Sequence, residues 1–363
     1  MSETLLPGSG FDTYEEQDKV LVGMSGGVDS SVAVRILQQQ GFAVTGAVIR
    51  FSPAHDAAVE AAQKAAKQMD VECIVLDAQE LFEQEVVAPF CADYCAGRTP
   101  NPCVRCNPAV KFTALLAAAD KLGIQYIATG HYARVEVDGD GVSRIHLPES
   151  AARDQSYMLS RLDQDVLSRL ILPLGEFEKD DVREMARDFG LDCADAPDSM
   201  EICFIPDGDY AGFIQRYAGR SFPPGAFVGT AGQVYGEHRG IIHYTVGQRK
   251  GLGLSFPQPM YVCKIDPGRN QVVLGEHREL FSRELEAVGC NLIAVEKIEK
   301  PLRVKAKVRY RQEEQPATVE QVDPDRLRVV FDEPQRAITK GQAVVLYDGD
   351  TVVGGGTIGE MGE

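Results

Sequence analysis

The chain has 363 residues, of which 44% are hydrophobic and 25% charged, an ordinary composition for a globular protein. This length predicts two or three domains, each large enough to bury a core. No continuous apolar run is long enough to cross a bilayer, and five acidic residues precede the first lysine, Lys19. We therefore expect a soluble cytoplasmic protein with no signal peptide and no membrane partner.

The charge balance is strongly acidic, with 54 Asp and Glu against 37 Lys and Arg and a net charge of −17. This balance argues against a protein that coats nucleic acid nonspecifically, although a locally basic site is still compatible with it. The nine cysteines are odd in number and unevenly spread. In a large chain without a secretion signal, this pattern favours metal or redox chemistry over a disulfide framework.

The first part of the chain alternates short apolar runs with helical spacing. Residues 1–18 are expected to be a flexible lead-in. Strands are predicted at 20–23, 43–48, 73–76 and 126–129, and helices at about 28–40, 57–69, 110–119 and 180–189. Repeated units of this size imply an α/β domain over residues 19–206, with a parallel sheet covered by helices.

The composition changes after about residue 206. Glycine and proline punctuate short β-like runs through residues 207–284, which we interpret as a small central module. Beyond residue 285 the pattern alternates almost throughout, with strands predicted at 303–311, 326–331, 343–347 and 351–353. Short strands separated by Gly and Asp-Gly turns predict a C-terminal β-barrel over residues 285–363.

The clearest local motif follows the first predicted strand. It contains glycines, hydroxyl side chains and one carboxylate: Gly23, Met24, Ser25, Gly26, Gly27, Val28, Asp29, Ser30 and Ser31. A glycine turn between a strand and a helix aims unpaired backbone N–H groups and the positive helix end at one point, where an anion can bind. The motif has no lysine and is therefore no Walker A loop, and it does not fit GxGxxG.

Residues 25–30 resemble the pyrophosphate-binding loop of the N-type ATP pyrophosphatases (PP-loop enzymes), which split ATP between the α and β phosphates. Further motifs narrow the resemblance, and they lie at 96–102, 106–112, 128–134, 154–157, 198–204 and 244–253. In this order and at these spacings, the chain from about residue 20 onward is similar to the bacterial tRNA-specific 2-thiouridylase family.

This resemblance implies ATP-dependent 2-thiolation of the wobble uridine, position 34, in tRNAs for Lys, Glu and Gln. ATP with Mg²⁺ would adenylate the uracil O2, with Ile49 and Gly130 joining the loop in the ATP site. Cys203 would carry a persulfide and Cys106 would be the nucleophile that liberates the sulfur, leaving a disulfide. The sulfur would come from a cysteine desulfurase, a sulfur-relay protein or free sulfide.

The resemblance also implies positions that touch tRNA or its target base. These are Asn101, Pro102, Cys103, His131, Arg153, Asp154, Gln155, Arg309, Tyr310 and Gln342. His131 follows a predicted strand, at the edge where open α/β sheets bind ligands. A histidine at such a position is more often structural, and its motif favours the binding role.

The chain departs from the family at Cys103, where an aspartate is common. Three interpretations stay open. Cys103, Cys106 and Cys203 would hold a [4Fe-4S] cluster, as in some related tRNA thiolases. Alternatively, the CxxxC…CxxC spacing of Cys91, Cys95, Cys103 and Cys106 would hold zinc. In the third interpretation Cys103 is an ordinary thiol beside persulfide chemistry.

A run of basic residues in the last third is the predicted phosphate track. Arg303, Lys305, Lys307, Arg309 and Arg311 occupy alternate positions, so a strand would project all five from one side. A solvated outer face is the alternative interpretation of this stripe. Arg249 and Lys250, within a glycine-rich stretch of the central module, are a second candidate contact.

We therefore predict a three-part tRNA thiolase. The α/β domain activates the base, the central module guides the tRNA and the barrel binds it. One alternative is another PP-loop tRNA thiolase or an adenylating synthetase. An alternative of another class is a non-catalytic, zinc-containing tRNA-binding module, which would not need the intact loop at 25–31.

Overall fold

The computed structural model describes residues 18–197 and 202–359 and divides into two compact units. The first unit comprises residues 1–85, 103–206 and 350–352, and the second comprises 86–102, 207–349 and 353–363. Residues 1–17 of the expected lead-in, and the motif residues Asp198, Ser199 and Glu201, lie outside the described residues. No helix in the described ranges is long and apolar enough to span a bilayer.

The first unit contains a parallel sheet in the order β3-β2-β1-β4-β7. Its strands are β1 (Lys19–Met24), β2 (Ala43–Arg50), β3 (Cys73–Asp77), β4 (Tyr126–Thr129) and β7 (Leu170–Ile171). The central strands are apolar because helices cover both of their faces. The predicted parallel α/β sheet is therefore confirmed.

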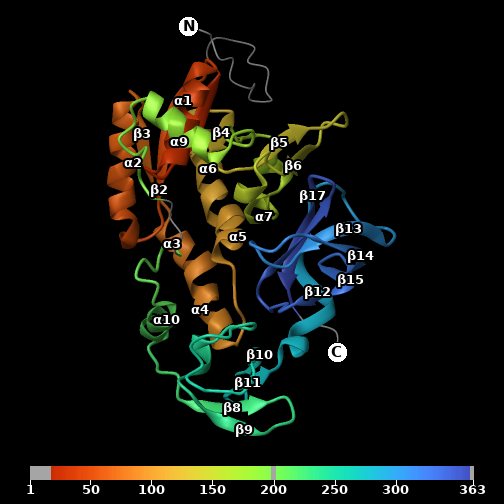
Figure 1. Cartoon of the computed structure of the whole chain (residues 1–363). Helices are drawn as coiled ribbons and strands as arrows, with labels where there is room; N and C mark the ends of the chain where they lie inside the picture. The colour runs from red at the N-terminus through yellow and green to blue at the C-terminus, as the bar shows by residue number, and fades with distance from the viewer. Residues whose placement is uncertain (1–17, 198–201, 360–363) are drawn as a thin grey trace. The chain divides into compact units, whose positions relative to one another are not determined.

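The two faces of β1 show which helices cover the sheet. Val20, Val22 and Met24 belong to a core shared with α1 (Val28–Gln39), α2 (Asp56–Gln68) and α9 (Lys179–Asp188). Gly23 points to the other face, where a Cβ would meet Leu115 Cδ1 of α6 (Thr113–Leu122) at 3.2 Å. Figure 1 shows α1 and α9 together on one side of these strands.

Shorter elements complete the first unit. They are η1 (Pro53–His55), α3 (Gln79–Phe82), η2 (Glu83–Val87, which runs into the second unit), α5 (Pro102–Cys106), the π-helical η3 (Asn107–Phe112), β5 (Arg134–Val137), β6 (Ser143–His146), η4 (Ala151–Arg153), α7 (Ser156–Leu159) and α8 (Gln164–Leu167). The predicted helix at 110–119 is thus a π-helical turn that continues into α6.

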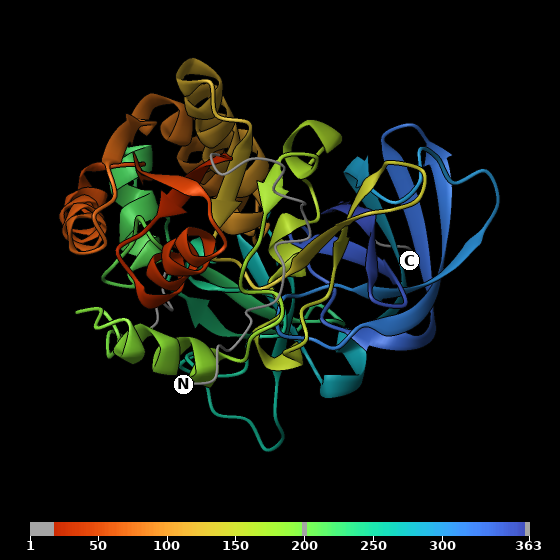
Figure 2. The ribbon, with the colours of Figure 1, turned by 90° about the horizontal axis from the view of Figure 1, so that it is seen from above.

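The second unit contains two β-structures. A four-stranded sheet has the order β10-β11-β8-β9, and six strands form a barrel in the order β12-β15-β14-β13-β16-β17, which closes by pairing β17 with β12. The blue strands curl around one another in Figure 2. Buried apolar side chains such as Leu285, Val319 and Phe331 fill the barrel, so the predicted C-terminal β-barrel is confirmed.

The elements of this unit have the following bounds: α4 (Ala88–Cys95), α10 (Tyr210–Ala218), β8 (Gly225–Gly229), β9 (Val234–His238), η5 (Ile241–His243), β10 (Tyr261–Asp266), β11 (Gln271–Gly275), η6 (His277–Leu280), β12 (Phe281–Leu292), β13 (Leu302–Lys307), β14 (Gln315–Asp323), β15 (Arg326–Arg336), β16 (Ala343–Asp348) and β17 (Thr351–Ile358). The strand predicted at 303–311 therefore ends at Lys307, four residues early.

Candidate active site

The order of the strands reverses at β1 of the parallel sheet, and the candidate nucleotide loop directly follows this strand. β2 and β3 follow on one side of β1, whereas β4 lies on the other side. Ligands of open α/β sheets bind at the carboxyl ends of the strands where the order reverses. The loop that follows β1, Ile49 near the end of β2 and Gly130 just after β4 all lie at this edge.

Serine hydroxyl groups form hydrogen bonds with the backbone inside the loop. Ser25 N–H donates to Ser30 Oγ at 3.1 Å, and Ser31 Oγ donates to Gly27 O at 2.9 Å. Gly27 caps α1 without any side-chain oxygen, so no side chain occupies the N–H groups of the first turn. These groups and the positive end of α1 are therefore free to bind an anion.

Two positions require glycine, because neighbouring atoms lie too close to leave room for a side chain. Gly26 has φ +77°, and a Cβ there would lie 2.6 Å from Ala61 Cβ. A Cβ on Gly130 would lie 2.8 Å from the carbonyl carbon of Asp29 and from the nitrogen of Ser30. The end of β4 thus approaches the beginning of α1 more closely than any side chain allows.

Asp29 is held by two residues whose roles the motif did not reveal. Its Oδ1 accepts from the hydroxyl of Tyr132 at 2.7 Å and from the ammonium of Lys179 at 2.6 Å. Tyr132 follows His131 within a motif that we noted, whereas Lys179 lies 150 residues away in sequence. The sequence feature that could have pointed to Lys179 is its place at the first position of a helix, where the helix dipole disfavours a positive charge.

Three cysteines of the first unit influence one another electrostatically. Cys103 and Cys106 lie on α5, and Cys203 follows the undescribed residues 198–201. The pKa of the Cys106 thiol is raised to about 12, chiefly by burial, with smaller contributions from negative charge at Cys203 and Cys103. The pKa of Cys203 is likewise raised to about 11, chiefly by desolvation and to a smaller extent by negative charge at Cys103.

Lys111, on η3, is the cation that opposes these shifts. Its charge lowers the pKa of Cys103, Cys106 and Cys203 alike, although in each case desolvation is the larger effect. Its own backbone N–H also favours the thiolate of Cys106. The sequence motif contained Lys111, but only the fold shows that it acts on all three thiols.

His131 is neutral and has a defined tautomer. Burial, and secondarily the charge of Lys111, holds its pKa well below the usual range. The Lys111 ammonium lies 3.4 Å from Nε2, and an ammonium can only donate. Nε2 is therefore the acceptor, and Nδ1 carries the proton that is donated to Thr129 Oγ1 at 2.7 Å.

The segment 153–155, which we expect to contact the target base, is hydrogen-bonded to Tyr132, the residue after His131. Gln155 Oε1 accepts from the backbone N–H of Tyr132 at 2.9 Å, and the backbone N–H of Gln155 donates to Tyr132 O at 2.9 Å. Asp154 Oδ1 accepts from the N–H and the hydroxyl of Ser156 at the start of α7. Arg153 ends η4 with an exposed side chain.

The remaining expected tRNA positions lie in the second unit, and they make local contacts there. Gln342 Nε2 donates to Thr99 O at 2.7 Å, two residues before Asn101. Arg309 Nη2 donates to Val246 O, Ala337 O and Thr339 Oγ1 at 2.6–3.0 Å. Tyr310 is half-buried, and Pro102 begins α5.

The prediction that five basic residues share one open face is wrong. β13 ends at Lys307, whose side chain is only 8% exposed, and Arg309 donates to the loop carbonyls described above. Arg303 and Lys305 do face outward, paired with Asp332 and Glu314. The opposite face is as predicted, since Val304, Ala306 and Val308 are buried in the barrel core.

The nine cysteines are all free thiols, so the expected disulfide is not present in this structure. Cys91 and Cys95 belong to the second unit, whereas Cys103, Cys106 and Cys203 belong to the first. Within residues 18–197 and 202–359, no group of three or more His, Cys, Asp or Glu side chains is arranged to hold a metal ion. Cys103, Cys106 and Cys203, which share the first unit, therefore form no metal site in this structure.

Three family models match consecutive parts of the chain. The family models described as tRNA methyl transferase HUP domain, tRNA methyl transferase PRC-barrel domain and Aminomethyltransferase beta-barrel domain match residues 18–207, 211–276 and 282–358. A structure described as a 4-thiouridine synthetase–RNA complex with bound ATP is 15% identical, with a TM-score of 0.36, and the match covers 55% of this chain and 50% of that one.

Two relatives are similar over nearly their whole length. The tRNA-specific 2-thiouridylase MnmA of Acetivibrio thermocellus is 47% identical over 94% of this chain and 99% of its own. The enzyme of the same name from Clostridioides difficile is 45% identical over 94% of this chain and 98% of its own. These matches decide against the non-catalytic alternative, and the chain belongs to the tRNA-specific 2-thiouridylase (MnmA) family.

Proposed function

We propose that this protein transfers sulfur to carbon 2 of the wobble uridine, position 34, in tRNAs for Lys, Glu and Gln, at the expense of ATP. Membership of the family supports this reaction. The observation that carries it is that Cys106 and Cys203, from distant segments of the chain, lie in one unit with the glycine-serine loop and influence each other's pKa.

The first step activates the base. Uracil O2 attacks the α phosphate of ATP, pyrophosphate leaves, and the O2 becomes part of a good leaving group, AMP. The free N–H groups at the start of α1 would hold the phosphates, and Ile49, which is 8% exposed, offers an apolar contact to the adenine.

Mg²⁺ fits the residues at this loop. All described hydrogen bonds to Asp29 go to Oδ1, which leaves Oδ2 as a carboxylate oxygen for a metal. One protein carboxylate together with substrate phosphates is a common way to bind Mg²⁺. The ion would neutralise charge on the departing pyrophosphate.

The second step transfers sulfur through the thiols. A cysteine desulfurase or a sulfur-relay protein that carries a persulfide of its own transfers the terminal sulfur to the Cys203 thiolate, and the donor cysteine leaves as a thiolate. Free sulfide, the alternative donor, is already at the oxidation level of hydrosulfide and would attack carbon 2 directly, without a persulfide. The Cys106 thiolate attacks Cys203 Sγ, a Cys106–Cys203 disulfide forms, and hydrosulfide leaves. Hydrosulfide then attacks carbon 2 and expels AMP. An external dithiol must reduce the disulfide before the next cycle.

Lys111 is the group that favours both thiolates in this scheme, since its charge lowers the pKa of Cys106 and of Cys203. We derive no step through an iron–sulfur cluster, because Cys103, Cys106 and Cys203 form no metal-binding group here. Cys103 is then an accessory thiol rather than a ligand.

For tRNA binding we propose three functional parts, residues 19–206, 207–284 and 285–363, after the lead-in 1–18. The first would hold the target base through His131 and the segment 153–155. In the other two, the exposed Arg249 and Lys250 would contact phosphates, and the exposed Arg303 and Lys305 would do so in competition with their carboxylate partners. Arg309 would act by holding the carbonyls of Val246 and Ala337, and so the loop that carries Arg249.

The test is single-turnover formation of 2-thiouridine by anaerobically purified protein, with iron, zinc and sulfide measured in parallel. Cys103→Ala should keep its activity under reducing conditions, whereas Cys106→Ala and Cys203→Ala should lose it without unfolding. If activity and bound iron fell together in Cys103→Ala, the cluster mechanism would replace the one proposed here.

A further inference from the structure

A buried lysine meets the nucleotide loop from a distant part of the first unit. The loop, residues 23–31, contains no Lys or Arg. Lys179, the first residue of α9, has a side chain only 7% exposed and reaches Asp29 Oδ1 at 2.6 Å. The core shared by α1 and α9 fixes this approach, since Val32 and Val182 both belong to it.

Both donors to Asp29 bind the same oxygen. Tyr132 donates to Oδ1 at 2.7 Å, and the Lys179 ammonium lies 5.8 Å from the centre of the Tyr132 ring, so the three side chains form one cluster. Oδ2 accepts no hydrogen bond from the described residues, and the Asp29 side chain remains 34% exposed. One oxygen is therefore anchored from within, and the other is available to a ligand.

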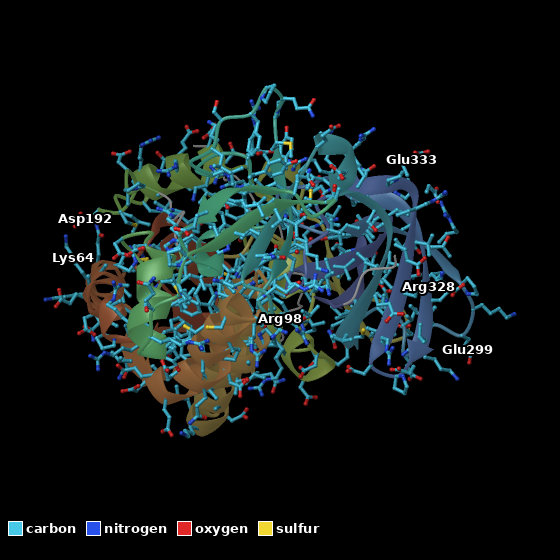
Figure 3. The ribbon with its side chains drawn as sticks, turned by 90° about the horizontal axis from the view of Figure 1, so that it is seen from below. Lys64, Arg98, Asp192, Glu299, Arg328 and Glu333 are labelled. Carbon is cyan, nitrogen blue, oxygen red and sulfur yellow. The ribbon has the colours of Figure 1, made fainter. Side chains whose placement is uncertain are left out.

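The position of Lys179 is unfavourable for a residue without a role. Burying an ammonium costs free energy unless it is paired, and the first turn of a helix repels positive charge. The Lys64–Asp192 pair in the same unit shows the ordinary arrangement, with an N–O distance of 2.8 Å and side chains 74% and 62% exposed. Figure 3 shows both residues at the outer edge of the molecule.

We propose that Lys179 is a positioning residue of the nucleotide site. Together with Tyr132 it fixes Asp29 through Oδ1, so that Oδ2 is oriented to bind the Mg²⁺ ion that accompanies the phosphates of ATP. This inference rests on the proposed use of ATP and adds the residues that make the loop competent. A glycine-serine loop without a lysine of its own thus depends on a charge supplied by α9.

The test measures binding of α,β-methylene-ATP, which cannot be split between those phosphates, by calorimetry across a Mg²⁺ series. Lys179→Met should weaken binding about tenfold or more, because an ionic hydrogen bond is lost, and should raise the Mg²⁺ concentration at half-saturation. Lys179→Arg should restore much of the affinity. Lys64→Met, the matched control, should bind like the wild type.

Wild-type affinity and an unchanged Mg²⁺ midpoint in Lys179→Met would overturn the inference. If the wild type itself bound no nucleotide, the proposed use of ATP would fail instead. Tyr132→Phe removes the second donor to Oδ1 while leaving the buried charge paired, so it applies the test even if Lys179→Met does not fold. It should also shift the Mg²⁺ midpoint upward, and an unchanged midpoint in this variant would count equally against the inference.

Discussion

The reactivity of Cys106 should depend steeply on pH. Burial is the main cause that raises the pKa of this thiol to about 12, and Lys111 only partly opposes it. A thiol with this pKa is thiolate in about one molecule in ten thousand at pH 8. Because the thiolate is the nucleophile, alkylation of Cys106 by iodoacetamide should rise about tenfold for each pH unit between 7 and 10.

Removing the nearby cation should slow this reaction further. A neighbouring opposite charge commonly lowers a pKa by about one unit or more. Because the charge of Lys111 lowers the pKa of Cys106, Lys111→Met should slow alkylation about tenfold at each pH in that range. Lys121→Met is the matched control, since Lys121 is exposed in the last turn of α6. Its alkylation rate should equal that of the wild type.

The assay follows the Cys106 peptide by mass spectrometry in reduced protein without ATP or tRNA. A rate that reaches a plateau between pH 6 and 8 would show that Cys106 is already a thiolate, and would refute the reasoning. An unchanged rate in Lys111→Met would show that Lys111 does not stabilise the thiolate.

Three further results are expected. Asp29→Ala should abolish tRNA-dependent release of AMP and pyrophosphate, whereas ADP as a wild-type product would exclude cleavage between the α and β phosphates. Arg309→Met should lower the free energy of unfolding by about 1–3 kcal/mol, because the charged hydrogen bonds to the buried Ala337 O and Thr339 Oγ1 are lost, and an unchanged urea midpoint would contradict this role. Gly130→Ala should weaken nucleotide binding, since its Cβ would meet the Asp29 backbone at 2.8 Å, whereas Gly139→Ala has nothing within 4 Å and should bind normally.

Local patterns predicted the sheet well because its strands are short, apolar and bounded by turns. The strand expected at 126–129 is β4, Tyr126–Thr129, and the helix expected after Gly27 is α1. The prediction of a strand at 303–311 was wrong about its end, because the alternation of residues continues past Lys307, where the chain leaves the strand. Burial of Lys307 depends on tertiary packing, which alternation does not encode.

The site was only partly predictable for a similar reason. The loop at 23–31 is contiguous, so its role is visible in sequence, whereas Lys179 and Asp29 are 150 residues apart and meet only through the packing of α9 on α1. Lys111 was visible as part of a motif, but its effect on three thiols depends on the fold. The spacing of Cys91, Cys95, Cys103 and Cys106 suggested a metal, yet the described residues form no such group.

The central claim is that one sulfur atom passes from Cys203 to the tRNA through attack by Cys106. Its most direct test loads the reduced protein with radiolabelled sulfur as a Cys203 persulfide and then adds ATP and tRNA without further donor. The account predicts label in 2-thiouridine, with one Cys106–Cys203 disulfide formed for each uridine modified. In Cys106→Ala the label should stay on Cys203, and labelled tRNA made by that variant, or by Cys203→Ala, would contradict the account.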